Sequence, residues 1–363
     1  MRCVMRGGGK FRALILSLLL IGDGLHGQAP VSPPPQEHTW PPQRPVSLLR
    51  GVTLGKPVAT HTIKQGNLSV LFRDNSRSPE ILGGIDSLFN VIDAPKFDAY
   101  DPDSPGGSAG MNFEHVISGH ADPYTRFAPR TGPYTLHPLP DGASVMLVRQ
   151  AKDSPWGLAN AAKYTVVAPH YIDYEFRCVP HAPERFGERG YALLFWANYM
   201  NDVEDVALNF RGVARPGGPE EWIAGDAPEG SALWRGGGTY RPLAAKVDLG
   251  FDDPHTMNLN NWSYDWPRIA QPFYYGRAAN GMVFILMFDK LWSAEEHIRF
   301  SLFKFKLRRG LKRPAWDFQY IMAKPEAGRE YGFYARVVWK KFVSPEDCEK
   351  EYRTWVAAKR AVK

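Results

Sequence analysis

The sequence predicts an all-β fold, a large antiparallel β-sandwich that ends in one C-terminal helix. Short runs rich in β-branched and aromatic residues recur along the chain, and polar residues, glycine or proline bound most of them. Several later runs alternate apolar and polar residues, as strands do when one face packs on a core. The clearest helical pattern lies at the C-terminus.

The N-terminal segment has the pattern of an export signal. Four basic residues precede the apolar run Ala13–Gly22, which is too short to span a bilayer as a helix. Small residues follow, and we expect cleavage near Gly27, so that residues 1–27 form a signal peptide. An uncleaved membrane anchor is the alternative. The protein is therefore expected to be secreted or periplasmic, with no stable membrane span after signal removal.

The net charge gives no reason to expect a nucleic-acid partner. The chain carries +6, and residues 1–27 account for +3 of it through four basic residues and one acidic residue, so about +3 remains. That charge is ordinary for a chain of this length. The basic run Lys304–Arg313 is the local exception, and we interpret it as a solvated strand end and turn.

The chain after the signal is expected to divide into three parts. Residues 28–48 hold seven prolines and form an extended linker. Residues 49–343 form the β-sandwich domain, whose length suits one large domain or two tightly joined sheets. Residues 344–363 form the C-terminal helix, packed on the sheet.

The first expected strands are the β-rich runs Leu68–Phe72, Ser144–Val148, Tyr164–Val167, Tyr171–Cys178, Tyr191–Asn198 and Val206–Arg211. Next, Phe273–Tyr275 and Met282–Phe288 flank Asn280-Gly281, a favourable pair for a type I′ hairpin turn. Residues 298–302, 316–320 and 331–337 then alternate apolar and polar side chains.

The C-terminal helix is expected over Ser344–Lys359. Ser344 suits the N-cap, Pro345 suits the first helical position, and two acidic residues complement the helix dipole in the first turn.

Two cysteines, Cys178 and Cys348, remain after signal removal. One disulfide and two separately buried thiols are both open interpretations, and the spacing matches no metal site. Neither cysteine, and no serine in a nucleophile elbow, supports nucleophilic catalysis. Dinucleotide-binding, P-loop and zinc-protease motifs are also absent from the sequence.

The first candidate site is the polar segment Gly110–Arg130, which reads as a functional loop on a rigid scaffold. Its candidate catalytic residues are Glu114, His115, His120, Arg126 and Arg130, and Asn112 is a candidate substrate-binding residue. Histidine exchanges protons near neutral pH, and a glutamate in an apolar pocket can do the same. The two arginines could clamp a carboxylate such as that of a uronic acid.

Strand alternation limits which of these groups act together. In a regular strand Asn112 and Glu114 share one face and His115 lies on the other. We therefore expect Glu114 to act with His120 or Asn112 rather than with His115. The competing interpretations are a loop held by its own hydrogen bonds and surface arginines paired with acidic neighbours.

The second candidate site follows far downstream, and its residues Trp262, Tyr264, Asp265, Trp266 and Arg268 are predicted to bind substrate. Sugar rings stack their C–H faces on aromatic planes, while their hydroxyls pair with carboxylates and guanidinium groups. A similar strip, Trp196–Asn201, ends another predicted strand. We interpret the nearby Phe273–Tyr275 as core. The two segments together predict a polar-aromatic cleft for a carbohydrate ligand.

No cofactor is predicted, although two groups of residues have the chemistry of metal ligands. His115 and His120, with Glu114 or Asp122, could ligate a divalent metal. Asp98, Asp101 and Asp103 could bind calcium, but they lack EF-hand spacing, and a solvated acidic turn is the favoured interpretation.

The overall pattern of long strands and loops rich in His, Glu and aromatic residues resembles the galactose-mutarotase-like β-supersandwich over roughly residues 50–343. That fold is shared by aldose epimerases and by domains of polysaccharide lyases and some glycoside hydrolases. The resemblance implies a glutamate base and a histidine acid, for which Glu114 with His115 or His120 are candidates. It implies a lyase, epimerase or hydrolase. The alternatives are a non-catalytic carbohydrate-binding or cell-surface protein and a metal-dependent hydrolase.

Overall fold

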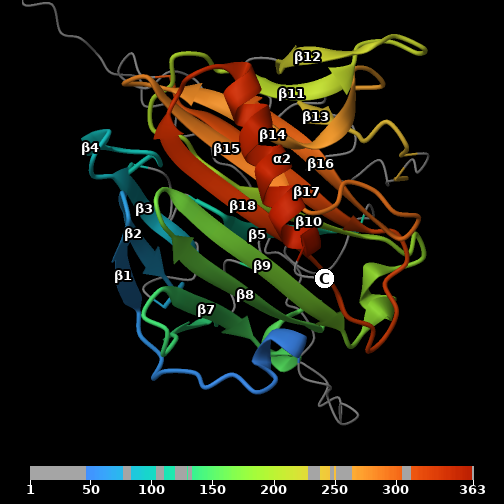
Figure 1. Ribbon diagram of the computed structural model, residues 1–363. Helices are drawn as coiled ribbons and strands as arrows, with labels where there is room; N and C mark the ends of the chain where they lie inside the picture. The colour runs from blue at the N-terminus through green and yellow to red at the C-terminus, as the bar shows by residue number, and fades with distance from the viewer. Residues whose placement is uncertain are drawn as a thin grey trace, which may run out of the picture. The chain divides into compact units, whose positions relative to one another are not determined.

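The computed structural model describes residues 46–76, 83–103, 110–118, 129, 133–227, 238–245, 249–250, 264–304 and 312–361. Within these ranges the chain forms three antiparallel sheets and a C-terminal helix, α2 (Figure 1). Three short 3-10 segments lie at Ser47–Leu49, Ala151–Asp153 and Pro183–Phe186. The predicted all-β fold class is therefore confirmed. In the described part of the chain, no helix is both long and apolar enough to cross a bilayer.

The largest sheet has nine strands. In spatial order they are β12 (Glu220–Gly225), β11 (Leu208–Val213), β14 (Arg268–Ala278), β15 (Met282–Phe288), β18 (Tyr331–Lys341), β9 (Tyr171–Pro180), β8 (Leu158–Val167), β7 (Ser144–Arg149) and β6 (Thr135–Pro138).

The other two sheets pack against this one. The five-stranded sheet has the order β13 (Thr239–Tyr240), β16 (Glu296–Lys304), β17 (Pro314–Met322), β10 (Ala192–Ala197) and β5 (Asn112–Ile117). The four-stranded sheet has the order β1 (Thr60–Gln65), β2 (Leu68–Arg73), β3 (Gly84–Asn90) and β4 (Ala94–Asp98).

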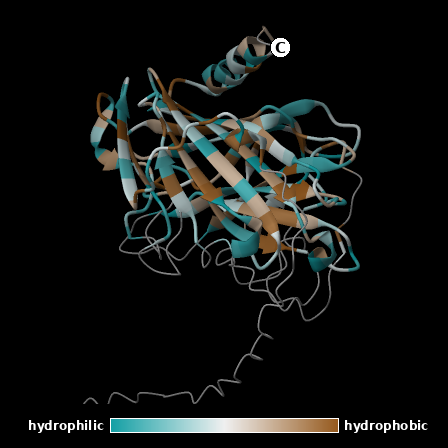
Figure 2. Ribbon diagram, turned by 90° about the horizontal axis from the view of Figure 1, so that it is seen from below, coloured by the Kyte–Doolittle hydropathy of each residue, from teal (hydrophilic) through white to brown (hydrophobic). Residues whose placement is uncertain are grey.

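Aromatic side chains fill the space between the sheets. Trp196 on β10 stacks on Phe318 of β17 at 5.1 Å and meets Phe176 of β9 edge-on at 4.8 Å. The four-stranded sheet joins the same core through Phe72, whose ring lies 5.3 Å from that of Tyr164 on β8. Hydrophobic residues, brown in Figure 2, alternate with hydrophilic ones along many strands.

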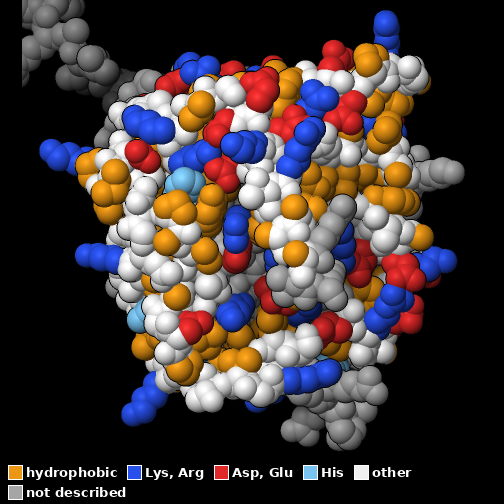
Figure 3. All heavy atoms as spheres, viewed as in Figure 1, with side chains coloured by type: hydrophobic (Ala, Val, Ile, Leu, Met, Phe, Trp, Pro, Cys, Tyr) orange, Lys and Arg blue, Asp and Glu red, His pale blue; other side chains and the backbone are white. Residues whose placement is uncertain are grey.

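The outer face of the nine-stranded sheet is covered by α2 (Pro345–Ala361), which crosses β14, β15 and β18 in Figure 1. Ser344 caps it as expected, because its Oγ accepts the Asp347 N–H at 3.2 Å. Tyr352 stacks on Phe273 at 5.0 Å. On this face basic and acidic side chains lie interspersed (Figure 3).

The Asn280-Gly281 turn confirms the predicted hairpin, since both residues have positive φ, 61° and 65°. Phe273–Tyr275 is buried, as the core interpretation requires. β8 begins at Leu158, six residues before the expected Tyr164. Half of the added residues are alanine, and the segment carries little strand propensity of its own, so pairing with β7 and β9 extends the strand.

The two cysteines are buried free thiols, which excludes the disulfide interpretation. Cys178 lies in the core between the sheets, whereas Cys348 lies on α2 and packs against the opposite face of the nine-stranded sheet. Burial raises the pKa of Cys178 well above its usual value and that of Cys348 to about 12.

Asp98, Asp101 and Asp103, weighed above as calcium ligands, are occupied by protein donors. Asp98 accepts the N–H groups of Leu88 and Tyr100 at 2.9 and 3.1 Å. Arg313 pairs with Asp101 at 2.6 Å and with Asp103 at 3.1 Å. Burial raises the pKa of Asp98 from 3.8 to about 7.

Cys178 and Cys348 should react with a disulfide reagent only after unfolding. The reason is that the reactive thiolate is disfavoured by burial at both positions. The protein used for this test starts at residue 28, so that Cys3 is absent. Thiol titration in native buffer and in guanidinium chloride measures this directly. Rapid labelling of either cysteine in native buffer would contradict the packing described here.

Asp98 should make the protein less stable as the pH rises from about 4 to about 7. A carboxyl whose pKa is higher in the folded state binds its proton more tightly there, so its contribution is most favourable below the unfolded pKa. Asp98→Asn keeps an oxygen that accepts both N–H groups and removes the ionisation. The variant should gain up to about 4 kcal/mol over the wild type at pH 8 and little at pH 4. Urea unfolding at pH 4, 6 and 8 tests this, and parallel pH profiles for the two proteins would rule it out.

Candidate functional site

The candidate site lies on the face of the five-stranded sheet that points away from the core, here called the polar face. Cross-strand partners place His115, Phe195, Gln319 and Arg299 in one row across β5, β10, β17 and β16. Residues that oppose each other directly share a face. The neighbours of this row in sequence, such as Phe318, belong to the core instead. The polar face is thus the second, non-core side of four adjacent strands.

A β-bulge in β5 brings Glu114 and His115 together. His115 pairs with Phe195 and Phe113 pairs with the next residue, Trp196, so Glu114 is an extra residue in the strand. Core packing agrees with a bulge at this position. Phe113 and Val116 both contact the core, so the two residues between them, Glu114 and His115, lie on the other side of the strand. Glu114 Oε2 lies 3.4 Å from His115 Nε2. The expectation that these side chains point to opposite faces is wrong, because it assumed a regular strand.

Tyr199, which follows β10, completes a three-residue cluster with this pair. Its hydroxyl donates a 2.6 Å hydrogen bond to Glu114 Oε1, a length typical of a bond to a carboxylate. Its own carbonyl accepts the N–H of Asp101 at 2.8 Å. The Glu114 and His115 side chains are only 2% and 3% exposed. The carboxylate therefore lies between a phenol and an imidazole and is shielded from solvent.

Asn112 lies beside this cluster, opposite Ala197, whose carbonyl accepts a 3.3 Å bond from its Nδ2. Asn112 is fully buried, and its Oδ1 has no hydrogen-bond partner among the described residues. A buried acceptor without a donor is costly, so Asn112 Oδ1 is an acceptor that a bound group could satisfy.

The polar face continues across β17, β16 and β13 as a buried hydrogen-bond network. Gln319 Nε2 donates to Thr239 Oγ1 at 3.2 Å and to Ser301 Oγ at 3.0 Å. Asp317 Oδ1 accepts the Asn198 N–H at 2.7 Å. Burial raises the pKa of Asp317 well above its usual value, so a carboxyl in this network binds its proton tightly.

Arg299 and His297 form the basic part of this network. Arg299 Nε donates to His297 Nε2 at 3.1 Å, so Nε2 is an acceptor and the ring is neutral. Burial, together with Arg299 and Arg241, lowers the pKa of His297 to about 2. This histidine is not a proton carrier near neutral pH.

Tyr199, Gln319 and Arg299 are not among the site residues predicted from the sequence. The alternation in residues 298–302 and 316–320 does indicate that these strands have a polar face opposite the core. Tyr199 lies in Trp196–Asn201, the aromatic and amide segment that ends another predicted strand. Neither pattern distinguishes a solvated strand face from a buried polar one.

The described residues of the downstream segment make local contacts, and their role in substrate binding stays a prediction. The Tyr264 ring packs toward the core, 5.5 Å from that of Tyr240. Asp265 forms an ion pair with Arg241, and the Arg268 guanidinium lies 5.6 Å from the centre of the Trp266 ring.

The two predicted segments do not meet within the described residues. The Tyr264 N–H donates a 3.1 Å hydrogen bond to the carbonyl of Thr239 on β13. That strand is at the opposite edge of the five-stranded sheet from Glu114 on β5. Three strands lie between those edges, which is roughly 19 Å at the usual strand spacing. The other predicted site residues, His120, Arg126, Arg130 and Trp262, lie outside the described residues.

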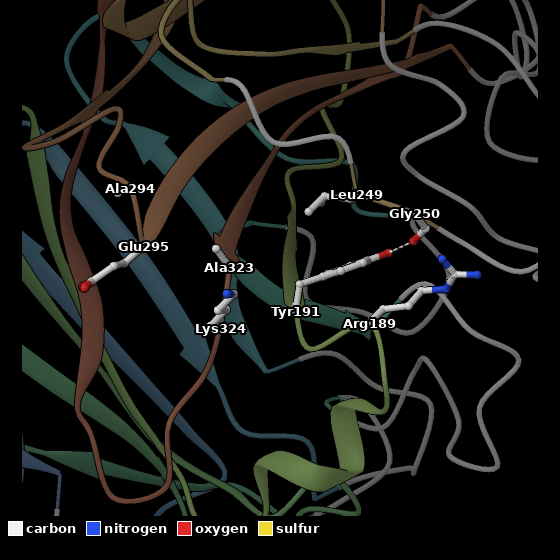
Figure 4. Close-up of a pocket in the computed structure, with 8 residues that line it drawn as sticks. All are labelled: Arg189, Tyr191, Leu249, Gly250, Ala294, Glu295, Ala323 and Lys324. Atoms are coloured by element: carbon white, nitrogen blue, oxygen red, sulfur yellow. Dashed lines mark hydrogen bonds between the residues drawn. The ribbon is translucent and has the colours of Figure 1, made fainter.

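A pocket of about 500 Å³ opens at one end of the five-stranded sheet. Figure 4 shows its lining, which includes Arg189, Tyr191, Leu249, Glu295, Ala323 and Lys324. Tyr191 and Leu249 belong to an apolar cluster on the polar face that also contains Phe195. The His115 ring lies 5.3 Å from that of Phe195, so contacts run from the pocket to the Glu114 cluster.

The described residues hold no group of three or more His, Cys, Asp or Glu side chains placed to bind a metal ion. Because His120 and Asp122 lie outside those residues, the alternative of a His115–His120 metal site stays open.

No protein-family model matches the chain, and no curated protein matches it in sequence. Solved structures do match its fold. One is a protein from Escherichia coli K12 provisionally assigned as an aldose 1-epimerase, with 10% identity, a TM-score of 0.39 and coverage of 78% of this chain and 99% of that one. Another is the protein HI1317, with 10% identity, a TM-score of 0.38 and coverage of 80% and 99%.

A third is a mutant of heparan sulfate lyase HepC from Pedobacter heparinus, with 9% identity and a TM-score of 0.40. That match covers 80% of this chain and 36% of the lyase, so the chain spans about a third of the enzyme. The resemblance stated from the sequence thus has counterparts among solved structures. At this level of identity and superposition, the matches assign no activity to this chain.

Proposed function

We propose that this protein is a carbohydrate-active enzyme that moves protons at a sugar ring, with Glu114, His115 and Tyr199 as its catalytic groups. One observation carries the proposal: the β5 bulge places adjacent glutamate and histidine side chains on one face, 3.4 Å apart. Bulges are common next to active sites, where they re-aim a side chain. The resemblance to galactose-mutarotase-like proteins, stated from the sequence, supports the choice of a sugar substrate.

The geometry suggests distinct roles for the glutamate and the histidine. If His115 Nε2 carries its proton toward the Glu114 carboxylate, Nδ1 holds the basic lone pair. Proton uptake at Nδ1 would form an imidazolium next to a carboxylate, and the attraction between them is stronger in a buried site than in water. Glu114 would then orient and stabilise the base, as a carboxylate does in a catalytic triad.

Tyr199 would be the acid of the cluster. Its hydroxyl is held at 2.6 Å by the same carboxylate, so it lies within reach of a group bound at Glu114. Asn112 Oδ1 offers an acceptor for a sugar hydroxyl. Proton removal by one group and delivery by another is the chemistry shared by epimerases and lyases, and the substrate determines which reaction follows.

We also propose that the enzyme acts outside the cytoplasm, because its N-terminal residues follow the signal-peptide pattern. N-terminal sequencing of the protein from a periplasmic or culture-medium fraction tests this. Cleavage near Gly27 is the expected result, and an intact N-terminus in a membrane fraction would favour the uncleaved anchor.

Activity should depend on all three groups. Purified protein is assayed on polyuronates for the unsaturated product, on aldoses for anomer exchange by NMR, and on neutral polysaccharides for new reducing ends. Glu114→Gln and His115→Gln should lower kcat by about 10²- to 10⁴-fold, the usual worth of general acid–base catalysis. Tyr199→Phe should lower it measurably, with the folded state checked by circular dichroism.

Matched controls use the same substitutions away from the site. Glu326→Gln removes one partner of an exposed ion pair with Arg329. Tyr334→Phe changes a ring that packs beside α2, on the opposite side of the nine-stranded sheet from the site. Both should keep wild-type kcat. If no substrate turns over but a glycan binds equally to wild type and Glu114→Gln, the protein is a binding module. Loss of turnover on adding a chelator would instead favour the metal-dependent hydrolase.

A further inference from the structure

Asn198 is a fully buried residue between the end of β10 and Tyr199, and the proposed chemistry does not use its side chain. Its Oδ1 accepts the Met111 N–H at 2.9 Å and the Tyr100 hydroxyl at 3.4 Å. A backbone N–H can only donate, so the oxygen of the amide must face Met111. This side chain therefore joins the end of β10 to the residue that precedes β5.

The bond to Met111 continues the pairing of β5 with β10 at the point where the two backbones stop pairing. Asn112 opposite Ala197 is the last pair of these strands. Met111 comes next and has a φ of 45°, which residues other than glycine rarely adopt and which takes the chain out of the extended conformation. Its N–H donates to Asn198, and its carbonyl accepts the Tyr164 hydroxyl at 2.8 Å. Side chains distant in sequence thus hold both polar groups of this residue.

The backbone of Asn198 is fixed to β17. Its N–H donates to Asp317 Oδ1 at 2.7 Å, and its carbonyl accepts the Trp316 N–H at 3.0 Å. The next residue, Tyr199, forms a β-bridge with Ala315. Asn198 is therefore a rigid link, whose backbone fixes the start of Tyr199 and whose side chain fixes the start of β5.

The register of β5 matters because it is an edge strand that contains a bulge. Among the described strands, β10 is its only neighbour in the five-stranded sheet. A shift of one residue moves every side chain of a strand to the other face. Such a shift would separate Glu114 Oε1 from the Tyr199 hydroxyl, which are 2.6 Å apart. The bond to Met111, three residues before Glu114, opposes this shift.

Only one end of the Asn198 amide is bonded. Its Nδ2 has no hydrogen-bond partner within the described part of the chain. A buried N–H group without an acceptor is costly, so the core gains nothing from this half of the side chain. The oxygen is the part of the residue that the surrounding structure uses.

We propose that Asn198 is a positioning residue, whose Oδ1 holds the start of β5 in the register that brings Glu114 to Tyr199. Its side chain bonds to Tyr100 and Met111 of the core, so it acts through the cluster and not on the substrate. Its effect on catalysis rests on the proposed function, whereas its effect on the Glu114–Tyr199 hydrogen bond rests on these contacts alone.

The first measurement needs no substrate. A hydroxyl proton in a 2.6 Å hydrogen bond to a carboxylate is strongly deshielded, so proton NMR of the wild type should show a downfield resonance that Tyr199→Phe removes. Asn198→Leu has a similar volume but no acceptor, and it should remove this resonance or shift it upfield. Asn198→Asp keeps an accepting oxygen and should retain it.

Asn90→Leu is the matched control. It removes another fully buried amide that accepts a backbone N–H, in the four-stranded sheet, and it should retain the resonance. An unchanged resonance in Asn198→Leu would overturn the proposal. A wild type without a resonance that Tyr199→Phe removes would contradict the hydrogen bond itself, and the proposal with it.

The second measurement uses a substrate found by the assays described above. Asn198→Leu should lower kcat by about 10- to 100-fold, the cost of a misplaced catalytic group, and change KM much less. In the Tyr199→Phe background the same substitution should lower kcat by no more than about twofold, because the two residues act as one unit. Equal losses in the two backgrounds would indicate an ordinary structural role and overturn the proposal. Asn90→Leu should keep wild-type kcat.

Unfolding temperatures check that the variants fold. If Asn198→Leu does not fold, Asn198→Ser takes its place, because its hydroxyl is too short to reach the Met111 N–H from the same backbone.

The two proposals fail in different ways. A resonance that Asn198→Leu removes, in a protein that turns over no substrate, would leave the positioning role standing and remove the enzyme. Turnover that depends on Tyr199, with kcat and the resonance unchanged in Asn198→Leu, would leave the enzyme standing and remove the positioning role.

Discussion

The packing of Trp196 is the interaction on which both the sandwich and the site depend. Its ring stacks between Phe113 at 4.8 Å and Phe318 at 5.1 Å, and its Nε1 donates to the Tyr174 hydroxyl at 2.8 Å. This one residue joins three strands of the five-stranded sheet to β9 of the nine-stranded sheet. Each aromatic pair adds about 0.5–1.5 kcal/mol beyond burial of its area, so several together hold the register firmly.

That register produces the bulge. Phe113 and Val116 both pack toward the core, although they are three residues apart and a regular strand would place them on opposite faces. The core thus requires an extra residue between them, and Glu114 takes that position with His115 beside it. Burying a carboxylate and an imidazole together is costly, and the hydrogen bond from Tyr199 offsets part of that cost. The core requires an extra residue in β5 but does not require a glutamate and a histidine there. The presence of these two side chains is therefore the reason to propose a chemical role.

Much of the fold was predictable because many of its elements are determined by residues that are close together in sequence. The Asn280-Gly281 turn, the Ser344 cap and the alternating runs of β16, β17 and β18 each depend on neighbours in sequence. The errors lay where tertiary pairing decides. Alanine-rich Leu158–Ala162 becomes strand only because two partners flank it. The alternation that contains Arg299, Asp317 and Gln319 left open whether the second strand face is solvated or buried. Cys178 and Cys348 were left open, since their places on opposite sides of one sheet follow from topology alone.

For the site, the sequence by itself determined which chemistry is present: a carboxylate, an imidazole and an amide within four residues, and an aromatic-amide strip at Trp196–Asn201. Only the tertiary structure decided which groups meet. It brought Glu114 to His115 by a bulge, added Tyr199 from β10's end, and placed Tyr264 at the far edge of the sheet. The physical reason is that strand alternation is a local rule, whereas a bulge and a sheet order are set by what the core must bury across strands far apart in sequence.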